Sequence, residues 1–258
     1  MDTRTAIILA AGFGRRLDAD EGHKILATVA GRPLLEYHLQ NLRRLGVVRV
    51  IVVTGFDADS LHERIAGFEA PTHMDLCCTH NEAFEARNGL SVLAGVDALD
   101  GDEPFWVVMS DHLFEAALFD ELAATWEIGH PPRLQGALVV DRKLDTIFDM
   151  PDATKVRTDP DDFGIGKHLK RFDAIDAGLF WCGPGFTDAL RRERDACGDC
   201  STSDAVRRLV ASRSFGFIDI GEYYWQDVDT PQARAHAEYL VDEKFAEPRD
   251  TYDSGPSV

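Results

Sequence analysis

Long apolar runs are scarce in this 258-residue sequence, and the longest, such as residues 104–109, have only the length of a β-strand. A helix that crosses a membrane needs roughly 18 or more apolar residues in succession. The sequence therefore predicts no direct membrane span. The apolar stretch at residues 6–11 is also too short and too poorly flanked for a secretory leader, so we expect a cytoplasmic location.

Cysteine is sparse as well. The five cysteines are an odd number, scattered along the chain, and do not resemble a disulfide framework. Cys197 and Cys200 form one C-x-x-C pair, but a structural zinc site usually needs two such pairs or added histidines. We expect neither disulfides nor zinc.

Positive charge is in short supply, with 27 Lys and Arg against 45 Asp and Glu, for a formal net charge of −18. Nucleic acids and anionic lipids require a basic face, so the composition disfavours both as partners. An anionic substrate would need a local cluster of lysine, arginine and metal to overcome this field.

Short β-type runs alternate with helical patterns along the chain. We expect strands at residues 5–11, 49–53, 74–79 and 105–109, with helices from residue 33 and at 60–65 and 90–99. This alternation predicts an α/β fold with a parallel sheet and helices on both faces.

The second half of the chain is less regular, so the sheet is expected to become mixed there. Its expected strands are residues 134–140, 154–157, 178–182 and 215–220, and its expected helices are 186–195, 204–211 and one starting at Pro231. We expect one domain over residues 1–245 and a flexible polar tail over residues 246–258.

A glycine-rich turn follows the first strand. It reads L-A-A-G-F-G-R-R-L over residues 9–17, and Lys24 lies seven residues after it. Glycines let the backbone approach a polyphosphate closely, amide hydrogens can point at its oxygens, and the arginines and lysine add positive charge. The loop is typical of triphosphate binding, although a tight turn with solvated arginines explains the residues equally well.

Two other phosphate-binding motifs do not fit. The dinucleotide motif G-x-G-x-x-G needs a third glycine where the chain has Leu17, which disfavours an oxidoreductase. A Walker loop needs G-K-[ST], which does not occur.

The pattern L-A-A-G-x-G-x-R with a following lysine is similar to the signature of the nucleotidyltransferases that make nucleoside-diphosphate sugars and related activated alcohols. The resemblance implies a Rossmann-like nucleotidyltransferase fold with a mixed, mostly parallel central sheet flanked by helices. It also implies that the loop cradles a triphosphate and that Lys24 contacts the phosphates. The family usually has proline where this chain has His23.

Three aspartates offer ligands for a metal. Asp111 follows the strand at 105–109, at the carboxyl end where open α/β sheets place their sites. Asp227 and Asp229 precede the helix at Pro231, where Asp229 or Thr230 can instead cap the helix. Carboxylate oxygens are what Mg²⁺ requires. The resemblance assigns Asp111, Asp227 and Asp229 to the metal site and Mg²⁺ as the cofactor.

Most of residues 5–240 resemble the inositol-1-phosphate cytidylyltransferases. The matching segments are M-S-D-H at 109–112, D-A-T-K-V at 152–156, I-G-K at 165–167, D-A-G-L-F at 176–180 and W-Q-D-V-D-T at 225–230. Those enzymes usually have threonine where this chain has Ala177.

The resemblance implies that the acceptor is bound by Thr154, Lys155, Lys167 and Asp176. The two lysines can hold an acceptor phosphate against the negative field, and Asp176 can accept hydrogen bonds from hydroxyls. Solvated lysines and a turn-forming Asp176 are the alternative.

Residues 87–91 correspond to the segment that reads the base in related enzymes. Asn88 and Ser91 can hydrogen-bond cytosine and Gly89 lets the ring lie against the backbone, while a helix N-cap is an equal alternative for Asn88. The nucleotide-binding residues expected from the resemblance are Leu9, Ala10, Ala11, Gly12, Gly14, Arg15, Lys24, Asn88, Gly89 and Ser91.

The implied reaction transfers CMP from CTP to a phosphate-bearing alcohol, with inositol 1-phosphate as the expected acceptor and CDP-inositol, a phospholipid precursor, as the product. A phosphate monoester is largely dianionic at neutral pH, so its oxygen can attack the α-phosphorus directly while pyrophosphate leaves. The expected catalytic residues, acting by positioning and charge neutralisation, are Arg15, Lys24, Asp111 and Lys167.

Several alternatives stay open at this point. The acceptor can be phosphocholine, a phosphonate or a sugar phosphate. A non-catalytic nucleotide sensor would need neither the metal ligands nor the acceptor lysines, so their joint presence favours an enzyme. The family's inositol enzymes are often fused to a membrane domain that uses the product, so a separate membrane phosphotransferase is an expected partner; a homodimer is left open.

Overall fold

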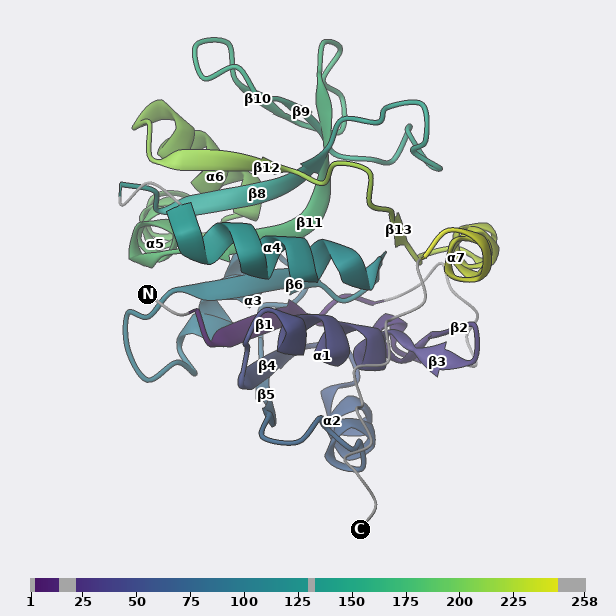
Figure 1. Cartoon of the computed structure of the whole chain (residues 1–258). Coiled ribbons are helices and arrows are strands. Elements are labelled where there is room, and N and C mark those ends of the chain that lie inside the picture. Colours follow the sequence, from purple (N-terminus) through teal and green to yellow (C-terminus); the bar gives the residue numbers. More distant parts are fainter. Residues whose placement is uncertain (1–2, 14–21, 130–132, 246–258) are drawn as a thin grey trace.

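The computed structural model describes residues 3–13, 22–129 and 133–245, which form thirteen β-strands and seven α-helices (Figure 1). Residues 14–21 of the glycine-rich segment and the predicted tail at 246–258 lie outside the described residues. The strands of the main sheet are β1 (Thr5–Leu9), β4 (Arg49–Thr54), β5 (Asp75–His80), β6 (Phe105–Met109), β8 (Gly136–Asp141), β9 (Lys155–Arg157), β10 (Gly164–Gly166), β11 (Ala174–Cys182) and β12 (Phe215–Asp219).

The nine-stranded sheet is parallel in its first half and mixed in its second. β1 lies between β4 and β6, parallel to both, and β5 extends this half beyond β4. β11 then runs antiparallel to β6, β8 and β9, and β12 returns parallel to β8. The predicted α/β fold with a mixed, mostly parallel central sheet is confirmed.

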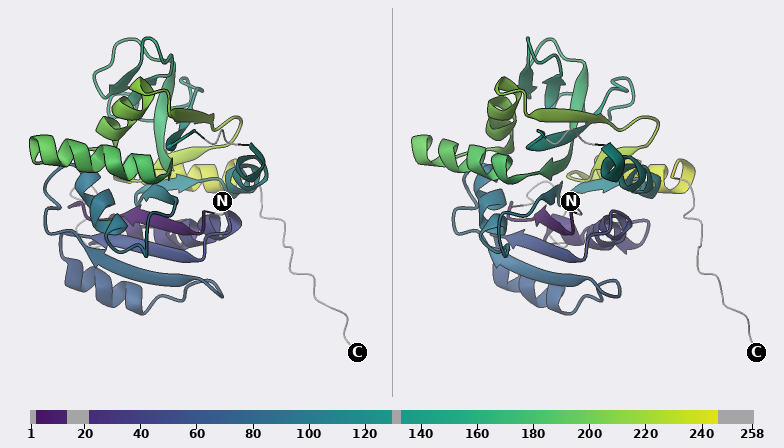
Figure 2. Two further views of the ribbon diagram at one scale, coloured as in Figure 1. Left: turned by 90° about the vertical axis from the view of Figure 1, so that its left-hand side faces the viewer. Right: turned by 60° about the vertical axis from the view of Figure 1, so that its left-hand side comes forward.

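Helices cover both faces of the sheet, as the alternation of patterns predicted (Figure 2). A helix over residues 116–129 was not predicted, although Leu118, Phe119 and Leu122 pack into the core. The helices are α1 (Leu34–Arg44), α2 (Ala58–Ala66), α3 (Asn88–Val96), α4 (Ala116–Gly129), α5 (Pro184–Cys197), α6 (Thr202–Ala211) and α7 (Pro231–Glu243), with a short 3-10 turn η1 (Lys24–Leu26). Across the ranges the structure describes, every helix is too short or too polar to cross a membrane.

Two apolar cores form because successive residues of a strand point to opposite faces of the sheet. Ile8 of β1 belongs to the core that contains residues of α1, α2 and α4, whereas its neighbour Ile7 belongs to the core that contains residues of α3, α5 and α6. Strands buried on both faces read as continuous apolar runs, which is why β1 and β6 were found from sequence.

A smaller group of elements lies where β1 and β6 end, to the right in Figure 1. α7 packs there against β13 and β2. Thr230 caps α7 by accepting a hydrogen bond from the Ala233 amide at 3.1 Å. Of the two predicted capping residues, Asp229 and Thr230, the helix uses Thr230. The short strands of this region are β2 (Thr28–Val29), β3 (Arg32–Pro33), β7 (His112–Phe114) and β13 (Trp225–Asp227).

Candidate active site

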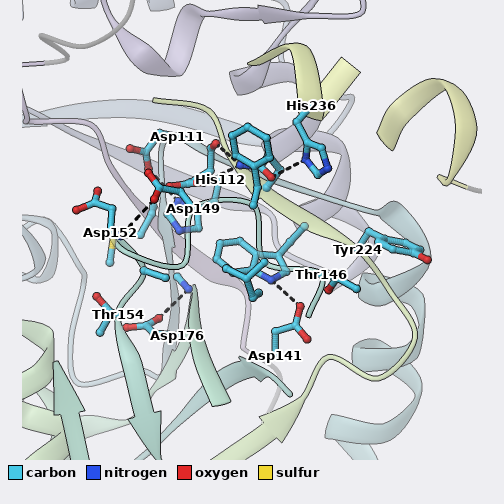
Figure 3. A pocket seen from close by; sticks show the side chains of 18 of the residues that line it. Asp111, His112, Asp141, Thr146, Asp149, Asp152, Thr154, Asp176, Tyr224 and His236 are labelled. Carbon is cyan, nitrogen blue, oxygen red and sulfur yellow. Dashed lines mark hydrogen bonds and ion pairs between the residues drawn. The ribbon is translucent and has the colours of Figure 1, made fainter. Parts of the chain in front are cut away.

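A cavity of about 630 Å³ opens at the carboxyl end of β6, between residues 142–154 on one side and β13 and α7 on the other. Figure 3 shows Asp111, His112, Asp149 and Asp152 gathered on one part of its wall, with Asp176 and Thr154 near one another and His236 at the far side. The predicted site residues that line it are Asn88, Asp111, Thr154, Lys167, Asp176 and Asp227.

The pairing of β7 with β13 brings the two acidic segments together. β7 turns back directly after Asp111 and runs antiparallel to β13, so that His112 lies opposite Asp227. The Val228 amide also donates to the Asp111 carbonyl oxygen at 2.6 Å. Two carboxylates from distant parts of the chain therefore reach one cavity.

Two buried side chains of α1 hold the corner that carries Asp111. His38 Nε2 donates to the carbonyl oxygen of Ser110 at 3.1 Å, and Asn41 Nδ2 donates to that of Phe114 at 3.2 Å. These bonds fix the backbone on both sides of Asp111, since a buried carbonyl must find a donor inside the protein.

Asp111 has two side-chain partners, a lysine and a histidine. Lys24 Nζ lies 2.7 Å from Asp111 Oδ2, and His112 Nδ1 donates to Asp111 Oδ1 at 2.9 Å. Burial raises the pKa of Asp111, but the His112 hydrogen bond and the charge of Lys24 outweigh it, and the net pKa lies far below the usual range. Asp111 is therefore a carboxylate at any working pH. Lys24 lies at the site through its ion pair with Asp111, and its contact with phosphates stays a prediction.

His112 lies among three carboxylates. Burial lowers its pKa, but the hydrogen bond to Asp111 and the charges of Asp111, Asp227 and Asp176 give a net increase. Its ring stacks on Trp225 with centroids 5.2 Å apart. Gly178 makes room for the ring, because a Cβ at that position would lie 2.7 Å from His112 Cδ2. The imidazole at the centre of this acidic cluster therefore gains a proton more readily than an isolated histidine does.

The carboxylates facing His112 are themselves shifted by burial. Burial raises the pKa of Asp176 to about 6, opposed by a hydrogen bond from the Gly178 amide and by His112. Burial also raises the pKa of Asp227, as do the charges of Asp229 and Asp111, while His112 opposes them. The repulsion of Asp227 by Asp229 and Asp111 is of the kind that a bound divalent cation relieves.

The residues fit a magnesium ion that substrate completes. Within the described ranges, no group of three or more His, Cys, Asp or Glu side chains is arranged to hold a metal alone. Mg²⁺, however, usually takes one or two carboxylates together with substrate phosphates. Asp111 and Asp227 meet that need at one cavity. Asp229 is buried and does not line the cavity, so its ligand role stays a prediction.

The glycine-rich segment is described only at its start. Leu9, Ala10 and Ala11 are buried, and the Ala10 amide already donates to the Val53 carbonyl oxygen. Gly12 is exposed at the end of this turn. Gly14 and Arg15 lie outside the described residues, so the catalytic role of Arg15 stays a prediction.

The predicted base-reading residues have partners within the protein. Asn88 lines the cavity, yet its amide exchanges two hydrogen bonds with Thr202 at the start of α6, so it does not cap its own helix. Ser91 is buried and accepts from Asn81 Nδ2 at 3.0 Å. Gly89 donates to the Cys200 carbonyl oxygen at 3.0 Å and leaves no room for a Cβ. This segment joins α3 to α6, and its contact with a base stays a prediction.

The two predicted acceptor lysines have different surroundings. Lys167 is half exposed, lines the cavity and pairs with Asp152. Lys155 is buried, and its ammonium donates to the carbonyl oxygens of Met150 and Pro151. Lys155 therefore supports the cavity wall from behind, and its geometry does not favour contact with an acceptor.

Ala177, the departure from the usual threonine, is fully buried in the core beneath α1 and α4. The cavity wall at this point consists of Asp176 and Gly178. The missing hydroxyl therefore does not change the lining.

Several lining residues were missed as site residues from sequence. His112 and Trp225 stand in the quoted motifs without a role. Asp141 is the last residue of β8, just as Asp111 comes shortly after the end of β6. A carboxylate at the carboxyl end of a strand was the signal that identified Asp111, and the same signal could have identified Asp141. Phe148 and His236, which stack on each other, gave no signal.

Comparison with known proteins gives matches along most of the chain. It is 34% identical over 242 residues to "Bifunctional IPC transferase and DIPP synthase" of Rubrobacter xylanophilus, covering 92% of this chain and 51% of that protein. It is 26% identical over 268 residues to "CMP-5'-(3-aminopropyl)phosphonate synthase" of Streptomyces rubellomurinus, covering 95% of this chain and 39% of that protein. The chain spans about half the length, or less, of these curated relatives.

Among solved structures, the inositol-1-phosphate CTP transferase from T. maritima superposes with a TM-score of 0.76 at 22% identity. The match covers 95% of this chain and 99% of that one, and it shows a shared fold. A family described as "MobA-like NTP transferase domain" matches residues 6–143, more than half of the chain. The chain therefore belongs to the family of MobA-like NTP transferase domains.

Proposed function

We propose that the chain is a cytidylyltransferase that transfers CMP from CTP to inositol 1-phosphate, giving CDP-inositol and pyrophosphate, with Mg²⁺ as cofactor. The pairing of β7 with β13, which sets Asp111 and Asp227 at one cavity, is the observation that carries the proposal. The names of the similar R. xylanophilus and T. maritima proteins support the type of transfer and the acceptor.

The proposed chemistry needs no protein nucleophile, because an oxygen of the acceptor phosphate attacks the α-phosphorus of CTP and pyrophosphate leaves. When bound by Asp111 and Asp227, Mg²⁺ would neutralise charge on the triphosphate. Lys24 adds a second positive charge beside the same carboxylate. As the triphosphate enters, the Lys24 ammonium exchanges Asp111 for phosphate oxygens, since a triphosphate carries more negative charge than one carboxylate.

The acceptor wall suits a polyol phosphate. Lys167 offers an ammonium to the phosphate. Asp176, with its pKa raised to about 6 by burial, is mostly ionised at pH 7 and accepts hydrogen bonds from hydroxyls. Asp145 and Asp149 add further acceptors on the same wall. A ring bearing several hydroxyl donors can satisfy carboxylates of this kind without bringing extra charge.

A second acceptor class is supported by the same carboxylates. An ammonium group, as in an aminoalkylphosphonate, would also be attracted to Asp145 and Asp149, and the S. rubellomurinus relative is named for such a product. Inositol 1-phosphate stays the first choice for two reasons. The R. xylanophilus protein, named as an IPC transferase, is more similar in sequence than the S. rubellomurinus protein. The match to the T. maritima inositol-1-phosphate CTP transferase covers nearly the whole of both chains.

Pyrophosphate release tests the proposal directly. CTP, ATP, GTP and UTP are each incubated with inositol 1-phosphate, phosphocholine, 3-aminopropylphosphonate or glucose 1-phosphate. We expect release with CTP and inositol 1-phosphate, and a higher rate with 3-aminopropylphosphonate would replace the acceptor while keeping the chemistry.

Asp111→Asn tests the metal and phosphate site. We expect kcat/KM to fall at least about 100-fold, because a group that stabilises developing charge is worth on the order of 3 kcal/mol. Asp120→Asn is the matched control, since Asp120 is exposed on α4 and pairs with Arg44 on the surface. Near-normal pyrophosphate release from the folded Asp111→Asn protein would contradict the assignment.

A further inference from the structure

Asp227 is held by a buried neighbour. Gln226 lies between Trp225 and Asp227 on β13 and is 4% exposed. Its Nε2 donates to Asp227 Oδ1 at 2.7 Å and to the Asp227 carbonyl oxygen at 2.8 Å. One amide nitrogen therefore fixes the carboxylate of Asp227 relative to its own backbone.

The other end of the Gln226 amide is fixed by α7. His236 Nδ1 lies 2.8 Å from Gln226 Oε1 and donates to it, because a carbonyl oxygen can only accept. This bond determines which way the amide is turned, and so keeps Nε2 directed at Asp227. Figure 3 shows His236 at the wall of the cavity with this bond drawn.

The same His236 ring is the docking point for residues 142–154. Phe148 stacks on it with centroids 4.7 Å apart and planes 24° apart, although Phe148 is 46% exposed. Around Phe148, the segment carries Asp145, Asp149 and Asp152, which line the acceptor side of the cavity. His236 thus contacts the acceptor wall through its ring face and the Asp227 support through Nδ1.

We propose that Gln226 and His236 are positioning residues for Asp227, and that the stacking of Phe148 on His236 fastens the acceptor-facing segment to the same pair. This inference rests on the proposed function. Hydrogen-bond partners of a metal ligand orient it, and their loss typically lowers metal affinity by about 10- to 100-fold. The hydrogen bond from His236 to Gln226 should affect metal affinity, and the stacking of His236 with Phe148 should affect the KM for the acceptor.

Two substitutions at one position separate these effects. His236→Phe keeps a ring for Phe148 and removes the donor to Gln226. His236→Asn keeps a donor near the position of Nδ1 and removes the ring. Phe148→Leu removes only the ring that stacks on His236. Gln226→Leu removes the hydrogen bonds to Asp227 but neither ring, and leucine has a volume similar to that of glutamine. His73→Asn is the control, because His73 is exposed in a turn with positive φ that asparagine adopts readily.

Binding of Mn²⁺, followed by electron paramagnetic resonance with α,β-methylene-CTP present, reports on Asp227 without turnover. We expect His236→Phe and Gln226→Leu to weaken Mn²⁺ binding about 10-fold or more, while His236→Asn and Phe148→Leu retain it. The KM for the acceptor, measured by steady-state kinetics, should respond to the opposite variants. We expect this KM to rise in His236→Asn and Phe148→Leu and to stay near the wild-type value in His236→Phe.

A role in stability alone would lower Tm in these variants without separating Mn²⁺ affinity from acceptor KM. Mn²⁺ binding by His236→Phe equal to that of wild type would overturn the positioning role. If wild type binds Mn²⁺ and His236→Phe does not, yet no CMP is transferred to any acceptor, the positioning role stands and the proposed function fails. Wild-type protein that binds no Mn²⁺ with any nucleoside triphosphate would overturn both.

Discussion

His38 reaches from α1 to the peptide just before Asp111. Burial lowers the pKa of its imidazole to about 4; the hydrogen bond to Ser110 opposes this shift and the charge of His112 adds to it. The ring is therefore neutral at pH 7. Its Nε2 carries the proton that the Ser110 carbonyl needs, so the corner that presents Asp111 depends on an uncharged histidine.

This histidine makes stability depend on pH. Its folded-state pKa lies below the value of about 6.5 in the unfolded chain, so the unfolded state gains a proton first as pH falls. The stability due to His38 is complete above about pH 6.5 and is lost toward pH 4. Between pH 7 and 5 we expect wild type to lose about 2 kcal/mol more than His38→Gln, whose amide donates but does not titrate.

Urea unfolding at pH 7, 6 and 5 measures the difference between the two proteins. The comparison is of slopes, so a constant offset caused by the substitution does not matter. Parallel pH profiles for the two proteins would show that His38 is protonated in the folded state as readily as in the unfolded one.

Sequence reasoning placed residues at the cavity where their own chemistry and position at an element's end suffice, and it could not reveal contacts that depend on a distant partner. Asp111 and Asp227 offer carboxylate oxygens at element ends, and the structure brings both to the cavity. Asn88 is engaged by Thr202, which lies 114 residues away, and no pattern around position 88 reveals that bond. The surroundings of Lys155 have a local cause: the carbonyl oxygens of Met150 and Pro151 accept its hydrogen bonds, and this backbone turn cannot be read from sequence.

Among elements, the buried strands of the parallel half were predicted, whereas the helix α4 and the short strands β7 and β13 were not. β1, β4 and β6 were expected within two residues of their observed ends, since each is a buried run. β7 and β13 have three residues each, too few for a periodic pattern. These two strands nevertheless assemble the site, so its central pairing could be inferred only through family resemblance.

The contact between α3 and the start of α6 depends on Gly89. A Cβ there would lie 2.7 Å from the backbone carbon and oxygen of Cys200, both of which are rigid. We expect Gly89→Ala to lower the free energy of unfolding by about 1–3 kcal/mol through overpacking. Gly101→Ala is the control, because among described atoms nothing lies within 4 Å of its added Cβ.

Urea unfolding compares the two alanine variants with wild type. An unchanged midpoint for Gly89→Ala would mean that α3 can shift away from Cys200 without cost. That result would leave the segment free to adjust when a base binds.

At the scale of the whole molecule, negative charge sets the conditions for binding. The net charge is −18, and the cavity is lined by seven aspartates against Lys167 and Lys244. A triphosphate entering alone would meet repulsion from this field. We therefore expect CTP with Mg²⁺ to raise Tm, and CTP with EDTA to leave it nearly unchanged.

Differential scanning fluorimetry over a CTP titration measures this shift. At about 100 times Kd the ligand should contribute roughly 2.7 kcal/mol to stability. The shift should be absent with Mg²⁺ alone at the same ionic strength. Equal shifts with and without EDTA would show that the protein's own cations suffice to hold the triphosphate.

The pairing of β7 with β13 also governs when this protein can first act. During synthesis, β6 and β7 leave the ribosome long before β13, which is the last strand among the described residues. The parallel half of the sheet can begin to form early, because β1, β4, β5 and β6 pair with one another, and only β6 gains a later neighbour, β11. Asp111 is then made before Asp227, so under the proposed function we expect a nascent chain to bind nucleotide with Mg²⁺ only after β13 has been synthesised.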